Sequence, residues 1–148
     1  MFPGISKLTY SNGYWPYKIE SLTDDATVKF LQDYVCLIQL PIRDDNYDVY
    51  ADMHINERAV QDLANASELA WDSIRLHDAK ALGQAVSQCF RAQLEMFPNM
   101  ITEQVKQAID AYKDQLLGAK LTGAGGGGYL VCVASQKIKN SLSICIRT

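Results

Sequence analysis

Apolar and polar residues alternate in two stretches near the start of the chain, and this pattern predicts β-strands. The stretches are "ISKLTY" at residues 5–10 and "YKIES" at residues 17–21. Each has the two-residue period of a strand with one buried face. The "SNG" of residues 11–13 between them is typical of a turn, so we expect a hairpin. A continuous apolar run, "VCLIQL" at residues 35–40, predicts a third, central strand that Pro41 ends.

The middle of the chain changes to a spacing of three to four residues between apolar positions, which indicates helices. Each helix is preceded by a residue type that caps helix N-termini. The expected helices cover residues 56–76, 78–96 and 102–116, with Asn56, Asp78 and Thr102 as their caps. In the first helix we expect Val60, Leu69 and Trp71 to face the core.

Two short apolar segments near the end of the chain read as a further pair of strands. They are "AKLT" at residues 119–122 and "YLVCVAS" at residues 129–135, and a helix capped by Ser135 is expected after them. Strands and helices are therefore largely segregated along the chain. This order predicts one α+β domain over residues 1–148, in which an antiparallel sheet is covered by helices on one face.

Composition and charge narrow the class of protein. No apolar run approaches the roughly 20 residues of a membrane helix, and no secretory leader is recognisable, so we expect no membrane partner and a cytoplasmic location. The four cysteines sit among apolar neighbours without metal-ligand spacing, which predicts buried free thiols. Every Asp and Glu lies at or before Asp114, and this acidic body argues against a nucleic-acid partner.

The glycines concentrate at one point, between the last two predicted strands. Five of the nine lie in residues 123–128, "GAGGGG". Ordering glycine is entropically costly, so such a run is either a flexible linker or a loop whose backbone comes very close to a ligand. The apolar flanks favour the ordered loop. Its small residues and amides would suit an anion; the candidate ligand-binding residues are Thr122, Gly123, Ala124, Gly125, Gly126 and Gly127.

Two common nucleotide motifs do not fit this loop. Gly123, Gly125 and Gly128 match the spacing of the dinucleotide fingerprint, but a strand-like segment follows instead of a helix, and no acidic residue follows at the required distance. The phosphate-loop motif of P-loop enzymes needs Lys and Ser or Thr where this chain has Tyr129 and Leu130. The loop therefore needs another explanation.

A few charged residues are candidates for binding or for ion pairs. Arg43 follows the central strand and could bind a substrate or phosphate group, since a guanidinium matches oxyanions well, although an ion pair with Asp44 or Asp45 is the simpler interpretation. Lys120 precedes the loop and points either toward a phosphate or toward solvent. The acidic cluster near residue 45 is interpreted as a solvated turn rather than a metal site. We predict no catalytic residue and no metal ligand in this chain.

The segment "KLTGAGGGGY" at residues 120–129 closely resembles the third signature motif of the GHMP kinase superfamily. In that superfamily the motif lies in the C-terminal domain, where its loop lines the cleft beside the phosphates of bound ATP. The resemblance implies a ferredoxin-like GHMP kinase C-terminal fold, with ATP and Mg²⁺ as cofactors. "MFPGISKL" at residues 1–8 and the segment 81–110 are similar to L-fucose kinases, which implies transfer of the ATP γ-phosphate to a hydroxyl of a small sugar.

Several sequence features of complete GHMP kinases are not found in this chain. The Pro-x-x-x-Gly-Leu-Gly-Ser-Ser-Ala phosphate loop of the N-terminal kinase domain is not in the sequence. The family's catalytic acid would precede Met1, and its magnesium ligands are expected outside this chain. We therefore expect a C-terminal fragment that is inactive alone and whose partner is the missing N-terminal domain. Two alternatives stay open: a kinase for a heptose phosphate or another small molecule, and a catalytically inactive, stand-alone ligand-binding remnant.

Overall fold

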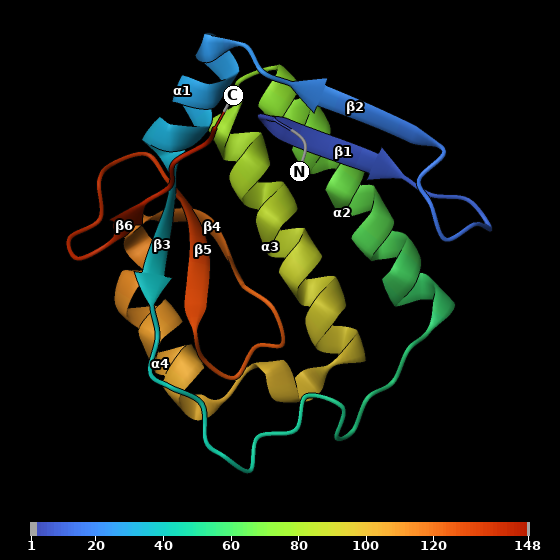
Figure 1. Cartoon of the computed structure of the whole chain (residues 1–148). Helices are drawn as coiled ribbons and strands as arrows, with labels where there is room; N and C mark the ends of the chain where they lie inside the picture. The colour runs from blue at the N-terminus through green and yellow to red at the C-terminus, as the bar shows by residue number, and fades with distance from the viewer. Residues whose placement is uncertain (1–2, 148) are drawn as a thin grey trace.

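The computed structural model describes residues 3–147, which form helices and strands arranged as in Figure 1. The strands are β1 (Ile5–Thr9), β2 (Lys18–Leu22), β3 (Val35–Gln39), β4 (Leu116–Leu121), β5 (Tyr129–Ala134) and β6 (Leu142–Ser143). The helices are α1 (Asp25–Tyr34), α2 (Glu57–Arg75), α3 (Ala79–Met96) and α4 (Glu103–Tyr112), with short 3-10 turns at Pro98–Met100 and Lys113–Gln115. Met1, Phe2 and Thr148 lie outside the described residues.

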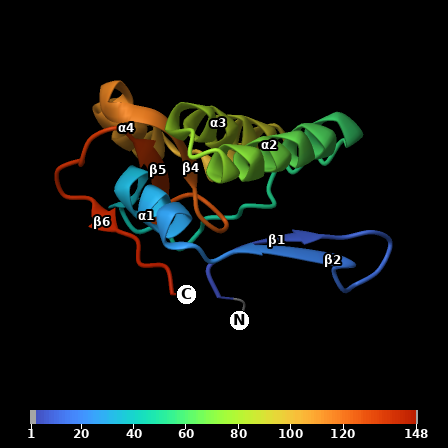
Figure 2. The ribbon, with the colours of Figure 1, turned by 90° about the horizontal axis from the view of Figure 1, so that it is seen from above.

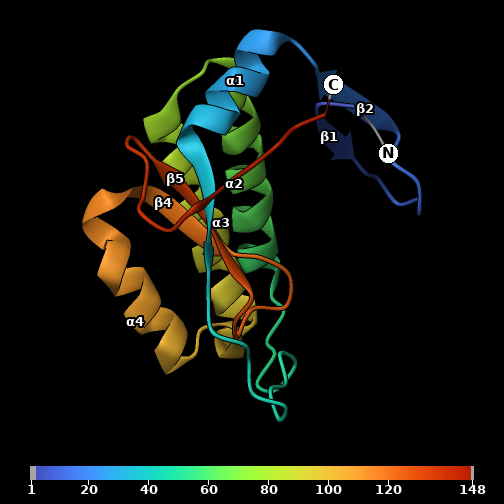
Figure 3. The same ribbon diagram turned by 60° about the vertical axis from the view of Figure 1, so that its left-hand side comes forward.

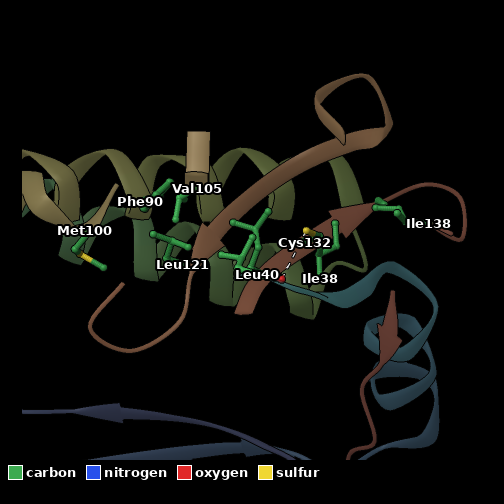
Figure 4. Close-up of a cluster of buried hydrophobic side chains, with 10 residues drawn as sticks. Ile38, Leu40, Phe90, Met100, Val105, Leu121, Cys132 and Ile138 are labelled. Carbon is green, nitrogen blue, oxygen red and sulfur yellow. Dashed lines mark hydrogen bonds between the residues drawn. The ribbon is translucent and has the colours of Figure 1, made fainter. Parts of the chain in front are cut away.

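The larger sheet has the strand order β4-β5-β3-β6, and all its neighbouring strands are antiparallel. Leu130 of β5 is paired with Ile38 of β3 on one side and with Leu121 of β4 on the other. All three residues belong, with Phe90 of α3 and Val105 of α4, to the cluster of buried apolar side chains that forms the main core (Figure 4). The predicted α+β class, an antiparallel sheet with helices packed on one face, is confirmed.

Helix α3 approaches strand β4 very closely at a pair of glycines. A Cβ atom at Gly118 would overlap the carbonyl oxygen of Gly83, and a Cβ at Gly83 would lie 2.5 Å from the carbonyl carbon of Leu117. Only residues without a side chain allow this backbone contact. The contact fixes α3 beside β4, and therefore beside the loop that follows β4.

Helix α1 packs at the end of the sheet where α2 ends and α3 begins. Phe30 of α1 stacks on the ring of His77 at 5.2 Å, and the Thr27 hydroxyl lies 3.0 Å from Nε2 of the same histidine. Asp24 caps the helix by accepting a hydrogen bond from the Thr27 amide, and this bond lowers the pKa of the Asp24 carboxyl. The sequence analysis did not predict this helix.

The β1–β2 hairpin forms a separate two-stranded sheet in front of α2 (Figure 2). Lys7 forms an ion pair with Glu68 of α2, so the face of β1 that carries Lys7 is turned toward that helix. Side chains alternate along a strand, so the opposite face carries Leu8 and its cross-strand partner Ile19. These two are 37% and 42% exposed. The face toward α2 therefore carries the pairs Ile5–Leu22 and Lys7–Glu20, and the outward face carries Ser6–Ser21 and Leu8–Ile19.

Exposed aromatic residues continue that outward face at the hairpin's end. The connection between its strands, residues 10–17, includes Tyr14 and Trp15, which are 87% and 78% exposed, together with exposed Tyr10 and Tyr17. Two-stranded sheets are marginally stable alone. We name Leu8, Tyr10, Tyr14, Trp15, Tyr17 and Ile19 the hairpin face.

Several further sequence predictions are tested by this structure. The hairpin, the central strand and the strand pair around the glycines are present, and Asn56, Asp78 and Thr102 cap their helices as expected. The third helix ends at Tyr112, not Leu116, because a 3-10 turn leads directly into β4. Val60 and Leu69 are exposed; α2 instead buries Trp71 with two alanines and a serine, the small residues that let it pack closely.

The helix expected after Ser135 is wrong for the described residues. Residues 135–147 form an irregular chain that contains β6, and Leu142 of β6 pairs with Leu37 at the edge of β3. Asn140 has a φ of 65°, which interrupts a right-handed helix. The free edge of β3 thus outweighs the weak local preference for a helix.

The structure also bears on the predictions made for the cysteines and for membrane-spanning helices. All four cysteines are free; Cys132 is fully buried, and burial raises the pKa of its thiol to about 12, whereas Cys145 is exposed, contrary to expectation. Among the described residues, none of the helices has the length and apolar character needed to cross a bilayer.

Candidate functional site

The glycine loop, residues 122–128, connects β4 to β5 with a backbone that most residues cannot adopt. Gly123, Gly125, Gly126 and Gly128 have φ values between 59° and 85°. This is the left-handed region, where a side chain costs conformational energy and glycine does not. Gly125, Gly126 and Gly127 are also buried. The concentration of glycine therefore builds a folded loop, as the sequence predicted.

Thr122 closes the base of the glycine loop. Its amide donates a hydrogen bond to the Tyr129 carbonyl at 3.0 Å, and its hydroxyl donates to the same oxygen at 3.1 Å. Both polar groups of Thr122 are thus used to join the ends of the loop. This arrangement gives Thr122, one of the candidate ligand-binding residues, a structural role in closing the loop.

A long connection between β3 and α2, residues 40–56, packs against the glycine loop at the end of the sheet (Figure 3). The Leu40 amide donates to the Gly128 carbonyl at 2.9 Å. A Cβ atom at Gly127 would lie 2.5 Å from the Pro41 carbonyl oxygen and 2.9 Å from the Arg43 amide nitrogen. The missing side chain at Gly127 is therefore what allows this contact between two backbones.

Tyr47 of the 40–56 connection lies directly over the glycine loop. Its hydroxyl donates a hydrogen bond of 2.6 Å to the Ala124 carbonyl, and its ring occupies the space that a Cβ at Gly126 would need. Burial raises the pKa of this hydroxyl, which keeps it a neutral donor, although Arg43 acts in the opposite direction. Tyr47 thereby covers part of the loop.

Arg43 lies beside the loop but not in the expected ion pair. Its guanidinium carbon is 5.8 Å from the centre of the Tyr47 ring, the range of a cation–π contact. The described residues show no ion pair between Arg43 and Asp44 or Asp45. Asp44 instead accepts a hydrogen bond from the Asn46 amide, which makes the acidic cluster a turn as expected. The guanidinium is exposed and available to a ligand.

Met100 also contacts the glycine loop. The Gly126 amide donates to the Met100 carbonyl at 2.8 Å, and a Cβ atom at Gly125 would lie 2.8 Å from the Met100 Cβ. One amide that could have faced an anion is therefore used within the protein. In residues 3–147, no hydrogen-bond partner is found for the amides of Gly123, Ala124, Gly127 and Gly128.

A shallow hollow of about 450 Å³ opens where the loop, the 40–56 connection and the start of α4 meet. It is lined by Asp44, Asn46, Tyr47, Thr102, Glu103, Gln104 and Gly126. The two carboxylates disfavour a bare anion in the hollow itself, whereas acids, amides and hydroxyls together suit a ligand rich in hydroxyl groups. Lys120 lies elsewhere, half-buried on β4 opposite Val131.

The groups of the glycine loop suit a phosphate better than a metal ion. The amides of the exposed residues Gly123, Ala124 and Gly128, which have no partner among the described residues, and the exposed Arg43 cation can donate hydrogen bonds to phosphate oxygens. For Mg²⁺ the described residues offer no group of three or more His, Cys, Asp or Glu side chains placed to share an ion.

Sequence reasoning found the glycine loop and Arg43 but missed Tyr47 and Met100. Tyr47 and Ala124 are 77 residues apart, and no periodic pattern connects them. The one available signal was the length of the 40–56 connection, since loops longer than about 12–15 residues are usually functional.

Comparisons with known proteins agree with this geometry. Residues 69–143, about half of the chain, match the family model for the GHMP kinases C terminal domain. A crystal structure of mevalonate kinase superposes with a TM-score of 0.59 at 18% identity, over 79% of this chain and 37% of that kinase. At this identity the likeness shows the fold alone, and the chain spans well under half of that kinase's length. No curated protein matches the sequence.

The family match covers α3, α4 and the whole glycine loop, whereas the 40–56 connection precedes the matched residues. The structural likeness independently supports the same α+β arrangement. The chain therefore belongs to the family of GHMP kinase C-terminal domains.

Proposed function

We propose that this chain is the C-terminal half of an ATP-dependent sugar kinase of the L-fucose kinase type. The carrying observation is the glycine loop, which has unpartnered amides at the exposed residues Gly123, Ala124 and Gly128 and meets the backbone of Arg43 at Gly127. In this proposal residues 123–127 form the wall of the cleft on the phosphate side. Phosphoryl transfer depends mainly on positioning and on charge stabilisation, and both are what such a wall contributes.

The acceptor in this proposal is a sugar hydroxyl. The hollow beside the loop supports it, because Asp44 can accept hydrogen bonds from hydroxyl groups, and the Asn46 and Gln104 amides can both donate and accept them. The likeness to L-fucose kinases rests on residues 1–8, of which Met1 and Phe2 lie outside the described residues, and on residues 81–110. A heptose phosphate is the alternative acceptor, and Arg43 is the residue that would bind its phosphate.

The proposed partner is an N-terminal kinase domain that carries the phosphate loop, the catalytic acid and the magnesium ligands. The hairpin face supports this, because its apolar and aromatic side chains are exposed, as is typical of a protein interaction site. The alternative, a ligand-binding remnant without catalysis, predicts that the chain binds a nucleotide or sugar but that no longer form of it turns over.

The test is MgATP turnover, followed as ADP release, with L-fucose and a panel of other sugars and sugar phosphates. We expect no turnover by residues 1–148 alone, and turnover when the polypeptide is extended by the upstream coding region. Clear turnover by the 148-residue chain would contradict the proposed division of labour. No turnover by the extended polypeptide with any acceptor would favour the remnant.

A pair of substitutions in the extended enzyme tests the role of the loop. Gly125→Val and Gly126→Val place side chains against Met100 and the Tyr47 ring, at residues with φ of 76° and 71°. We expect both variants to lose turnover while keeping the helix content of the parent. Gly13→Ala is the control, since its Cβ would meet nothing closer than 3.9 Å. Normal turnover in the valine variants would refute the loop's role.

A further inference from the structure

Tyr47 joins two features that are far apart in the sequence, the glycine loop and Arg43. Its hydroxyl donates to the Ala124 carbonyl at 2.6 Å, and the face of its ring lies under the Arg43 guanidinium at 5.8 Å. The ring is half-buried between them. One side chain therefore contacts both of the groups that would meet a phosphate.

Within residues 3–147, Tyr47 is the only outside side chain that donates a hydrogen bond to the glycine loop. Among the described residues, the other contacts that hold the loop come from backbone atoms: Met100 to Gly126, and Leu40 to Gly128. The ring also packs where a Cβ at Gly126 would lie, so ring and backbone are in direct contact. Changing Tyr47 therefore changes the loop without altering the backbone that supports it.

The hydrogen bond to Ala124 sets the direction of a loop amide. In a trans peptide the carbonyl of Ala124 and the amide of Gly125 point in opposite directions. With its oxygen turned to Tyr47, this peptide turns the Gly125 amide toward the Thr122 carbonyl, at 3.4 Å. The peptide groups before and after the Ala124–Gly125 peptide are then constrained as well, and the first of them carries the free amide of Ala124.

We propose that Tyr47 is a positioning residue that fixes the glycine loop and the Arg43 guanidinium relative to each other. The hydroxyl fixes the loop through Ala124, and the ring holds Arg43 through the cation–π contact. The order that it imposes on the loop follows from this geometry alone. Its effect on catalysis rests on the proposed kinase function, because pre-organised groups accelerate phosphoryl transfer only if the loop meets the phosphates.

Amide hydrogen exchange in the 148-residue chain tests the hold on the loop without any assumption about activity. Tyr47→Phe keeps the ring but removes the donor, so we expect exchange at the Gly125, Gly126 and Gly127 amides to rise roughly fivefold, the factor of a typical net hydrogen bond. Tyr47→Leu should raise it further. Tyr50→Phe is the matched control, since Tyr50 lies in the same connection and is 69% exposed.

The amides of β5 show whether a variant keeps its fold, and they should exchange at the parent rate in all three variants. If Tyr47→Leu unfolds the chain, the milder Tyr47→Phe still decides. Loop exchange in Tyr47→Phe that equals the parent and the Tyr50→Phe control would overturn the proposal.

Kinetics of the extended enzyme test the link to Arg43. If the ring holds the guanidinium, Tyr47→Leu and Arg43→Ala should be non-additive in kcat/KM for ATP, because the first already releases Arg43. Tyr47→Phe, which keeps the ring, should be additive with Arg43→Ala. Additivity in both pairs would overturn the link. If the extended polypeptide shows no turnover, that result contradicts the kinase proposal but not the role of Tyr47. The amide-exchange experiment then decides whether Tyr47 orders the loop.

Discussion

At the residue scale, the glycines of the loop are required for two different reasons. Gly123 has a φ of 59° and open space around its missing side chain. Gly127 has an ordinary φ, but a side chain there would meet Pro41 and Arg43. The first requirement is conformational and the second is steric, and the printed sequence shows the same letter for both.

Alanine and asparagine substitutions should separate these reasons. At Gly123, alanine should lower the free energy of unfolding by about 1–2 kcal/mol, and asparagine by less, because it tolerates the left-handed region. At Gly127 the order should reverse: alanine costs about 1–3 kcal/mol by overpacking, and the larger asparagine costs more. Urea unfolding of the four variants measures this. The same order at both positions would show that one mechanism governs both glycines.

The polar candidates show that a residue's type narrows its role but its partner decides it. Thr122 is a good hydrogen-bonding residue at any loop edge, and here the Tyr129 carbonyl uses both of its donors. Arg43 follows a strand beside two aspartates, yet an aromatic ring is its contact. The partners of Thr122 are local and were foreseeable, whereas the partner of Arg43 depends on how the 40–56 connection folds back.

At the element scale, caps and periodicity were sufficient where an element has clear ends. Asn56, Asp78 and Thr102 each accept a hydrogen bond from the amide three residues on, as the sequence predicts. Helix α1 was missed because no glycine or proline separates it from β3: Tyr34 ends the helix and Val35 begins the strand. A helix-breaking residue between α1 and β3 would have indicated where the helix ends, and the sequence has none there.

The packing of α3 on β4 predicts a large effect from one methyl group. A side chain at Gly118 would overlap the Gly83 carbonyl, and both groups belong to backbones held in regular structure. Gly118→Ala should therefore lower the free energy of unfolding by about 3 kcal/mol or more. Gly13→Ala, in open space, should stay within about 0.5 kcal/mol of the parent. Thermal or urea unfolding followed by circular dichroism compares them; equal stability of the two variants would contradict the close approach.

At the scale of the whole molecule, the hairpin face is a group of exposed apolar and aromatic residues on one two-stranded sheet. Leu8 and Ile19 lie on the face of the hairpin away from Lys7. Exposed apolar patches of this kind are typical of protein interaction sites. An additional protein surface over the hairpin face would explain this exposure.

Trp15 is a built-in reporter for such a surface. The chain has two tryptophans; Trp15 is 78% exposed and Trp71 is buried at 7%. In the 148-residue chain we expect acrylamide to quench Trp15, and Trp15→Phe to remove the quenchable emission. In the extended polypeptide Trp15 should be protected, because the N-terminal domain is expected to cover the hairpin face. Equal quenching in both polypeptides would mean that this domain lies elsewhere.

The sequence by itself determined the local elements, the glycine loop and the family resemblance. Helix caps, strand alternation and left-handed glycines act over about four residues, so they can be recognised along the chain. The family match then confirmed the resemblance of "KLTGAGGGGY" to the GHMP kinase superfamily.

Only the tertiary structure decided what surrounds the loop and which faces are buried. Tyr47 meets Ala124 across 77 residues, Val60 is exposed where periodicity placed it inside, and the last segment lies along β3 instead of forming a helix. The physical reason is common to all three. Contacts between distant segments depend on how whole elements pack, and that packing outweighs local preferences of a fraction of a kcal/mol per residue.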